Sequence, residues 1–330
     1  MSQDDQAFAF THRPVMVDDV VDLLGPVPAG VVLDATVGGG GHAEAILAAH
    51  PHLTLLGIDR DADALRAAAA TLARFGDRVA LHHARFDGLL AVMERAGISW
   101  LSAAVFDLGV SSWQLDRADR GFSYREDAPL DMRMDRDDDE NPTAAHLVNT
   151  LDERDLAHLF AEHGEARWAR RIARGIVAAR ATRPVRTTEE LVEIVKAAIP
   201  APARRTGGHP AKRVFQALRV EVNRELEVLP GALDDAIGVL APGGRAVVLA
   251  YHSGEDRIVK ERFTSASTGD CVCPPGLPCG CGADARITTR LLNRGARKPS
   301  AAEVAANPRA ESARLRAVEK LAVAPERQNS

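Results

Sequence analysis

The chain has 330 residues and a formal net charge of −5, with 46% hydrophobic and 26% charged residues. These values are ordinary for a globular protein, and the length suits one large domain with a smaller one. The longest apolar runs, such as Val27–Leu33 and Ala246–Ala250, are too short to span a bilayer. The acidic start Met1–Asp5 lacks the basic and apolar regions of a secretory signal. We therefore expect a cytoplasmic protein without a membrane-spanning segment.

Apolar runs alternate with helical patterns over the first hundred or so residues, which indicates βαβ units. Pro14–Leu24 carries valine and leucine at helical spacing, and Ala62–Phe75 has the composition of a helix. A further helix is expected at about His42–His50. The predicted strands are Val31–Asp34, Leu53–Ile58, Val79–His82 and Ala103–Phe106.

The alternation stops after the fourth predicted strand. A loop with an acidic run covers Arg117–Asn141, and a flexible basic loop covers Arg204–Pro210. Thr187 and Glu190 have the spacing of a capping box at the start of a helix. The helices expected between these loops are Asp152–His163, Ala166–Ala181 and Thr188–Ile199.

The α/β pattern returns in the last third of the chain. Val214–Leu240 is expected to form one or two helices, interrupted around Pro230-Gly231. Arg245–Tyr251 and Ile287–Leu292 are predicted strands. The charged residues from about Arg309 onward are expected to be partly disordered.

The helical segment lies between the fourth and fifth predicted strands, so it is an insertion rather than an appended unit. We predict an α/β fold with a Rossmann-like sheet and an inserted, smaller all-helical domain. The α/β domain is then discontinuous, with residues 1–115 and 213–330, and the inserted domain comprises residues 116–212.

The inserted domain is strongly basic. Residues 165–213 contain twelve arginines and lysines against four glutamates, which gives +8 and leaves −13 for the remainder. One interpretation is a face built to bind phosphate within an otherwise acidic protein. The other is a set of solvated arginine-rich helices, and the charge alone does not decide between them.

A glycine-rich loop joins the first predicted strand to the next helix. Asp34 ends the strand, and Gly38–Gly41 follow it. Glycine permits positive φ and close approach to a ligand, and the helix start offers free N–H groups. Asp59 ends the next strand 21 residues after Gly38, where a carboxylate can accept both hydroxyls of a ribose. This arrangement predicts a nucleoside or nucleotide site.

Two ligands fit this pattern. The spacing Gly38-x-Gly40-x-x-Ala43 matches the dinucleotide fingerprint, so a nicotinamide-dependent oxidoreductase is one alternative. Asp34, however, would repel a pyrophosphate and suits the amino and sulfonium groups of S-adenosylmethionine. Only one glycine-rich half-site is present, and polar residues Asp107–Ser112 follow the fourth strand. These features favour S-adenosylmethionine.

Motifs along nearly the whole chain resemble the MraW/RsmH family, the 16S ribosomal RNA cytosine-N4 methyltransferases. They are His12–Met16, Asp34–His42, Asp107–Ser112, Arg120–Ser123, Pro129–Asp135, His209–Arg219, His252–Arg257 and Asn307–Ala310. The resemblance implies a class I S-adenosylmethionine-dependent methyltransferase. Its implied substrate is the N4 amine of a cytosine in 16S rRNA of the small ribosomal subunit, near the decoding centre. The oligomeric state stays open.

The resemblance also implies which residues bind the cofactor. Gly40, Gly41 and His42 would contact its amino-acid end, and Asp59 its ribose. The set is completed by Phe86, near the adenine, and by Asp107 and Gln114. A core aromatic is the alternative for Phe86. The family usually has Phe and Leu where this chain has Tyr251 and Gly254, and we expect these departures to be peripheral to the chemistry.

A cytosine amine is a poor nucleophile, because its lone pair is delocalised into the ring. Oxygens that accept its N–H groups would localise the lone pair and take up the proton after attack. Asp107, Ser111 and Ser112, with the Leu108 carbonyl, offer such oxygens and are the predicted catalytic group. An Asx-type turn with capping serines is the alternative. The target base must be unstacked to reach such a pocket.

Contact with the RNA backbone is predicted for Lys212 and Arg213, close to the active site. Trp168, among three arginines, is expected to be core rather than a platform for base stacking. A further alternative is a non-catalytic ribosome-binding factor that retains the fold of a cofactor-binding enzyme. The presence of Gly40, Asp59 and Asp107 argues against this alternative.

The cysteines form two Cys-x-Cys pairs, Cys271/Cys273 and Cys279/Cys281. They could hold a structural zinc, although the usual spacing in zinc sites is wider, or remain as thiols in a reducing cytosol. Methyl transfer itself requires no metal.

Overall fold

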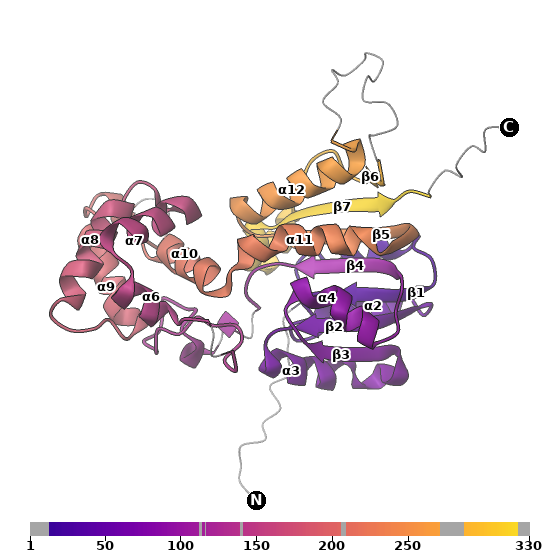
Figure 1. The fold of residues 1–330 in the computed structure, drawn as a ribbon, viewed down its shortest axis with the longest axis horizontal. Helices are drawn as coiled ribbons and strands as arrows, with labels where there is room; N and C mark the ends of the chain where they lie inside the picture. Colours follow the sequence, from indigo (N-terminus) through magenta and orange to yellow (C-terminus); the bar gives the residue numbers. More distant parts are fainter. Residues whose placement is uncertain are drawn as a thin grey trace, which may run out of the picture.

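The computed structural model describes residues 13–111, 114–115, 117–138, 141–205, 209–270 and 287–322. It has two parts, a helix-covered β-sheet and a helical unit (α6 to α10) beside one end of the sheet (Figure 1). Across these ranges, the helices are all too short or too polar to cross a membrane.

A seven-stranded sheet has the order β3-β2-β1-β4-β5-β7-β6. Neighbouring strands pair in parallel from β3 to β5, and β7 is antiparallel to both β5 and β6. The predicted Rossmann-like α/β fold is thereby confirmed. The strands are β1 Gly30–Asp34, β2 Leu53–Asp59, β3 Val79–His83, β4 Leu101–Asp107, β5 Leu240–Ala250, β6 Thr289–Leu291 and β7 Arg314–Lys320.

The central strands are continuous apolar runs because helices cover both of their faces. In β4 every residue from Leu101 to Phe106 is buried, and only Asp107 at the end is partly exposed. The parallel pairing brings the carboxyl ends of β1, β2 and β4 to one edge of the sheet, where each ends in an aspartate. In Figure 1 the β4 arrow points to the helical unit, which therefore lies at this edge.

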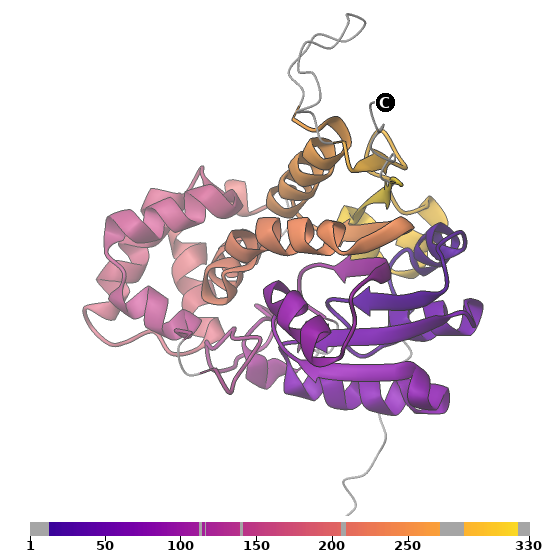
Figure 2. The same cartoon turned by 45° about the vertical axis from the view of Figure 1, so that its right-hand side comes forward.

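Two hydrophobic clusters, one on each face, hold the helices to the sheet. One includes Leu33, Phe106, Leu233 and Phe263, and the other Val20, Ile46, Val105 and Leu315. Figure 2 shows α11 lying along the first face. The helices on that face are α4 Leu89–Arg95, α11 Glu225–Gly238 and α12 Ser253–Thr268. Those on the other face are α1 Val17–Leu24, α2 Gly41–Ala49 and α3 Ala62–Leu72.

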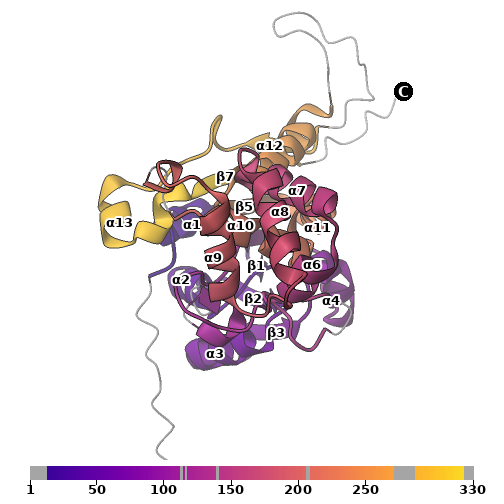
Figure 3. The same ribbon diagram turned by 90° about the vertical axis from the view of Figure 1, so that its left-hand side faces the viewer.

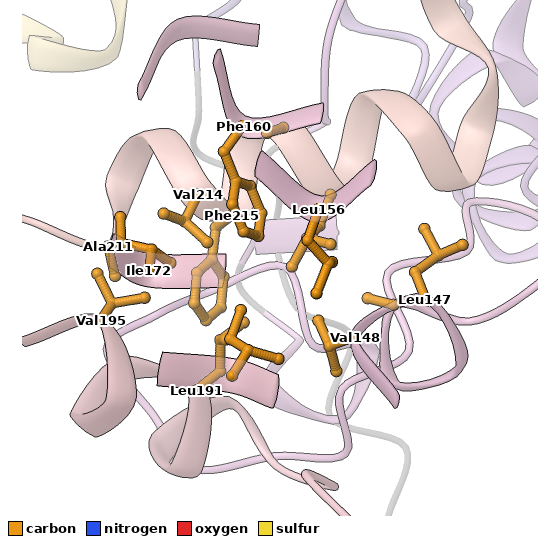
Figure 4. Close-up of a cluster of buried hydrophobic side chains, with 14 of the residues drawn as sticks. Leu147, Val148, Leu156, Phe160, Ile172, Leu191, Val195, Ala211, Val214 and Phe215 are labelled. Atoms are coloured by element: carbon orange, nitrogen blue, oxygen red, sulfur yellow. The ribbon is translucent and has the colours of Figure 1, made fainter. Parts of the chain in front are cut away.

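The helical unit has a hydrophobic core of its own (Figure 4). Phe160, Ile172, Leu191 and Phe215, from four different helices, are buried in it. The helices are α6 Ala144–Thr150, α7 Glu153–Phe160, α8 Ala169–Arg180, α9 Thr188–Ala198 and α10 Lys212–Asn223. A π-helical turn, Ala161–Glu165, joins α7 to α8. The core extends to Val222, so α10 packs with the helical unit, whereas the division of the domains at residue 212 stays a prediction.

The capping box at α9 is confirmed. The Thr187 hydroxyl accepts a hydrogen bond from the Glu190 amide, and the Glu190 carboxylate accepts one from the Thr187 amide, both at 3.3 Å. These bonds satisfy amide groups that have no partner within the helix, so a local sequence signal alone placed this helix start.

One local expectation is wrong. The break in the predicted helix lies at Arg224, with φ of 51°, and Pro230 is inside α11. The Asn223 carbonyl accepts a hydrogen bond from Arg60, a long-range contact that competes with continuation of α10.

The segment from about Arg309, expected to be partly disordered, contains a strand that was not predicted. This strand is β7, whose Leu315 and Val318 are buried, and Glu319 there is paired with arginines of both neighbouring strands.

Candidate active site and cofactor cavity

A cavity of about 340 Å³ opens at the carboxyl edge of the sheet. It lies where the strand order reverses between β1 and β4, the place at which open α/β sheets bind their ligands. Its walls come from the glycine loop, the loop after β4, the end of α10, and segments from near both ends of the described chain. The sequence-predicted residues found in its walls are Gly41, His42, Asp59, Phe86, Asp107, Ser111 and Gln114.

The glycine loop needs its glycines for backbone conformation and for close packing. Gly38 and Gly40 have φ of 51° and 87°, a region that favours glycine. A Cβ on Gly41 would lie 2.6 Å from Cγ of Pro14, so only glycine fits beneath that proline. Gly40 is not in the cavity wall, and a Cβ there would meet Leu72 of α3 at 3.2 Å. Gly40 therefore shapes the loop, whereas Gly41 and His42 face the cavity.

Asp59 is fixed by the two loops around it. Its Oδ2 accepts a hydrogen bond from the Gly38 amide at 2.8 Å, and its Oδ1 accepts one from the Asp61 amide at 2.9 Å. Burial raises the pKa of Asp59 to about 6, against the effect of these two bonds. The group is therefore mostly ionised at neutral pH. Each oxygen keeps a lone pair that can accept a ligand hydroxyl.

Asp107 lies between two side chains. Its Oδ1 accepts a hydrogen bond from the Tyr251 hydroxyl at 2.7 Å, and its Oδ2 is 3.5 Å from Nδ1 of His42. Nε2 of His42 is 2.9 Å from the Val15 carbonyl, which can only accept, so Nε2 carries a proton. Burial raises the pKa of Asp107. Tyr251 was expected to be peripheral, but it lies in the cavity wall and contacts Asp107.

Asp34 lies beneath the glycine loop and is 2% exposed. Burial raises its pKa to about 7, and Asp107 and Asp59 add to this effect, while His42 lowers it. Asp34 itself is absent from the cavity wall, whereas Asp59 and Asp107, whose charges act on it, line the cavity. Two carboxylates in the wall favour a cationic ligand over an anionic one.

A buried network holds Gln114. Its amide nitrogen donates to Oδ2 of Asp61 at 3.0 Å, and Arg120 donates to the same oxygen at 2.8 Å. The Gln114 amide oxygen accepts from the Ser111 backbone, and the Ser111 hydroxyl accepts from the Gln114 backbone. Arg120 also donates to the Met134 carbonyl at 2.8 Å. The network therefore joins the loop after β4, the start of α3 and the segment that leads into the helical unit.

Phe86 lies in the cavity wall, and its ring also meets Phe106 edge-on, with 6.0 Å between the ring centroids. Its contact with the adenine stays a prediction. Trp168 is half-buried against the core of the helical unit, as expected, and Arg167 and Arg171 lie over its ring at 4.9 and 5.6 Å.

Lys212 and Arg213 are exposed at the start of α10 and are absent from the cavity wall. The wall is formed instead by Arg219 and Asn223, towards the other end of the same helix. At 1.5 Å per residue, Arg213 and Asn223 are separated by about 15 Å along the axis. Arg213 lies 3.9 Å from Glu165.

Several other residues of the wall were not predicted from the sequence. Arg219 forms two hydrogen bonds with Glu225, at 2.9 and 3.1 Å, and lies 3.7 Å from Glu255. Arg219 belongs to the motif His209–Arg219. Its partner Glu255 belongs to another motif, His252–Arg257, and Glu225 lies outside the motifs. Local spacing therefore gave no sign of the pairing.

Two segments from opposite ends of the chain meet at the cavity. The Met16 amide donates to Glu303, and Arg297 pairs with Asp19, so that α1 and α13, Ala301–Ala306, lie side by side (Figure 3). As a result Arg13 and Arg309 both line the cavity. Two further motifs of the resemblance thus meet at the site.

Comparison with known proteins identifies the chain. The model of the MraW methylase family matches residues 9–321. The chain belongs to this family. Three relatives named ribosomal RNA small subunit methyltransferase H are similar over nearly their whole length. The protein of Thermobifida fusca is 53% identical, over 94% of this chain and 93% of its own. Those of Acidothermus cellulolyticus and Symbiobacterium thermophilum are 55% and 51% identical, each over 95% of this chain and over 94% and 98% of their own.

Membership of the methylase family confirms the predicted methyltransferase fold and S-adenosylmethionine as the cofactor, and the oxidoreductase interpretation is wrong. The cavity suits this cofactor, because its sulfonium and ammonium groups are cations and the wall carries Asp59 and Asp107, with the buried Asp34 close to both. A pyrophosphate would meet the carboxylates of Asp59 and Asp107 and be repelled.

Some predictions fall on residues outside the described ranges. These are Ser112 of the catalytic group and the cysteines Cys271, Cys273, Cys279 and Cys281. The choice between a zinc site and free thiols stays open.

Proposed function

We propose that this protein transfers the methyl group of S-adenosylmethionine to the N4 amine of a cytosine in 16S rRNA, within the small ribosomal subunit and near the decoding centre. The observation that carries the proposal is the position of Asp107, which lies in the cavity wall at the end of β4, with Oδ1 hydrogen-bonded to Tyr251 and Oδ2 at 3.5 Å from His42. The names of the relatives support a ribosomal RNA substrate. Such a substrate implies action in the cytoplasm.

The cofactor would be held by the cavity walls. Gly41 and His42 would contact its amino-acid end, Asp59 the two ribose hydroxyls, and Phe86 the adenine, with Gln114 and Asp107 completing the site. Gly40 would act through the shape of the loop. When bound, S-adenosylmethionine supplies a methyl group already activated by a positive sulfur, so the protein mainly has to orient the acceptor.

The acceptor amine needs an oxygen that accepts its N–H group. Asp107 supplies a carboxylate, and the Ser111 hydroxyl lies in the same wall. As the amine nitrogen would form a bond to the methyl carbon, the bond from that carbon to sulfur would break and leave a neutral thioether. The nitrogen must then lose a proton, and the carboxylate of Asp107 would accept it. Because burial raises the pKa of Asp107, this carboxylate is a better proton acceptor than an exposed one.

The target base must leave its stack to reach Asp107. Arg13 and Arg309 line the cavity and can bind the phosphates beside the extruded base. A second contact would be the basic surface at the start of α8 and α10, formed by Arg167, Arg170, Arg171, Lys212 and Arg213, all of which are exposed. Its distance from the cavity suits a long or folded RNA partner rather than a free nucleoside.

The proposal is tested by transfer of labelled methyl from S-adenosylmethionine to small ribosomal subunits that lack the modification, followed by nucleoside analysis. Label in N4-methylcytidine is the expected result, and it should disappear with Asp107→Asn. Label in another nucleoside would leave the methyltransferase assignment intact but overturn the cytosine-N4 proposal. Binding of cofactor and subunits without transfer would favour the non-catalytic ribosome-binding factor.

A further inference from the structure

We propose that Tyr251 is a positioning residue of the methyl-transfer reaction, whose hydroxyl fixes the orientation of the Asp107 carboxylate in the cavity. The inference rests on the proposed function, since it concerns the group that would accept the amine proton. Tyr251 itself lies in the cavity wall.

The contact is built into the sheet. Asp107 ends β4, which pairs in register with β5 through Leu249, and Tyr251 follows the end of β5. The Tyr251 amide donates to Oε2 of Glu255 at 2.7 Å, and Glu255 is 1% exposed. The backbone at both ends of the contact is therefore held, and the 2.7 Å bond from the hydroxyl to Oδ1 of Asp107 joins two fixed points.

The loop after β4 passes the tyrosine ring at Gly109. This residue has φ of 93°, a region that favours glycine, and a Cβ here would be in ordinary van der Waals contact with Cδ2 of the Tyr251 ring, at 3.7 Å. The glycine is therefore required by the turn of the loop, which lies against the ring. The hydroxyl reaches Asp107 beside this turn.

A carboxylate without a fixed partner turns easily about its last side-chain bond. Once Tyr251 holds Oδ1, the direction of Oδ2 is also set, and this second oxygen faces His42 at 3.5 Å. An incoming amine then meets an acceptor of known direction. Such alignment raises the rate of methyl transfer, because the carboxylate has no rotational freedom left to lose on the way to the transition state.

The charges around the pair favour a protonated tyrosine. Asp107 faces His42 from α2 and Glu255 from α12, and Asp34 of β1 interacts with it from below; Tyr251 also faces Glu303 of α13. Burial and the negative charge of Asp107 raise the pKa of Tyr251 well above its ordinary value. The hydroxyl therefore stays a donor, and its hydrogen bond lowers the pKa of Asp107 against the effect of burial.

The first test compares the pH dependence of methyl transfer in the wild-type chain and in Tyr251→Phe. Phenylalanine keeps the ring and removes only the hydroxyl. We expect kcat to fall about tenfold, the effect of losing one hydrogen bond to a charged group, with KM for S-adenosylmethionine nearly unchanged. The acidic limb of the profile should move to higher pH, since the carboxylate loses a bond that favours its ionised form.

The matched control is Tyr124→Phe, because Tyr124 and Tyr251 are the two tyrosines of the chain. Tyr124 stacks on His209 in the helical unit, with 4.4 Å between the ring centroids, and its substitution should leave the pH profile in place. A Tyr251→Phe enzyme with wild-type kcat and an unmoved acidic limb would overturn the proposal.

The second test needs no RNA and so separates this inference from the proposed function. In Tyr124→Phe, Tyr251 is the remaining tyrosine, and its ionisation is followed by tyrosinate absorbance, with circular dichroism to mark the pH range of the folded state. Within that range we expect Tyr251 to stay protonated, and to ionise at lower pH when Asp107→Asn is added. Ionisation at the ordinary tyrosine pKa, unaffected by Asp107→Asn, would show that the contact does not form. If the ionisation of Tyr251 depends on Asp107 but the protein methylates another nucleoside, only the proposed substrate is overturned, and the contact between the two residues stands.

Discussion

Nη1 of Arg120 lies 2.8 Å from Oδ2 of Asp61, and both side chains are buried, although 59 residues separate them in the sequence. Asp61 is also the N-cap of α3, where its Oδ1 accepts a hydrogen bond from the Asp63 amide. This ion pair connects the sheet, at the residue that begins α3, with the segment that leads into the helical unit. A second tie runs from Asn223, whose side chain bonds the Met132 carbonyl and the Met134 amide.

Loss of Arg120 should therefore destabilise the protein strongly. Arg120→Met leaves Asp61 buried without its cation, and we expect the free energy of unfolding to fall by about 3–5 kcal/mol, measured by denaturant unfolding. The exposed pair of Arg174 and Glu153 is the control, because Arg174→Ala should change stability by less than about 1 kcal/mol. Equal effects of the two substitutions would contradict the role given to the buried pair.

Asp34 should reduce the stability of the cofactor-free protein above neutral pH. Its pKa is about 7 in the folded protein, against an ordinary value of 3.8 for this side chain. An acid whose pKa is raised by folding binds more protons in the folded state, so stability falls as pH rises between these two values. The penalty is complete above about pH 7 and amounts to about 4 kcal/mol at most.

Asp34→Asn should remove this penalty, because the amide oxygen can still accept the bond from the Thr36 amide that Asp34 accepts at 3.2 Å. The gain in unfolding free energy over wild type should be small at pH 4 and largest at pH 8. The exposed Asp22→Asn should show no such trend. The same Asp34→Asn change should weaken binding of S-adenosylmethionine, measured by calorimetry, since it removes a negative charge beneath a cationic ligand.

Of the two predicted acceptor groups, Asp107 should contribute more to kcat than Ser111. Asp107→Asn removes the proton acceptor, and we expect kcat to fall by about 10²–10⁴, while Ser111→Ala should have a smaller effect because its hydroxyl also serves a backbone bond. The affinity for the cofactor, measured separately, checks that the site is intact. An Asp107→Asn enzyme that retained wild-type kcat would remove the chemical basis of the proposed function.

Arg309 and the pair Lys212 and Arg213 should act on RNA and not on the cofactor. Arg309→Ala and Lys212→Ala/Arg213→Ala are expected to raise KM for small subunits and to flatten its dependence on salt by about one phosphate contact for each cation removed. Affinity for S-adenosylmethionine should be unchanged. Arg294→Ala, an exposed arginine outside the cavity wall, is the control. An unchanged salt dependence in both variants would exclude these contacts.

The sequence by itself determined six of the seven strands of the described sheet, the glycine loop and the acidic strand ends. Val32, Leu33 and Ala103–Phe106 are buried apolar residues, and the turn at Gly38–Gly41 needs positive φ, so local periodicity and glycine were sufficient. The capping box at Thr187 is a signal of the same local kind. Parallel strands then bring Asp34, Asp59 and Asp107 to one edge by topology alone.

Only the tertiary structure decided which distant residues meet. Arg120 has no local feature that indicates Asp61 as its partner, and Tyr251 was expected to be peripheral until β4 and β5 brought its hydroxyl to Asp107. The charged segment around Arg316 became an inner strand of the sheet because ion pairs compensate its charges while Leu315 and Val318 are buried. Such contacts depend on how the whole chain packs, and the spacing of residues along the sequence does not contain that information.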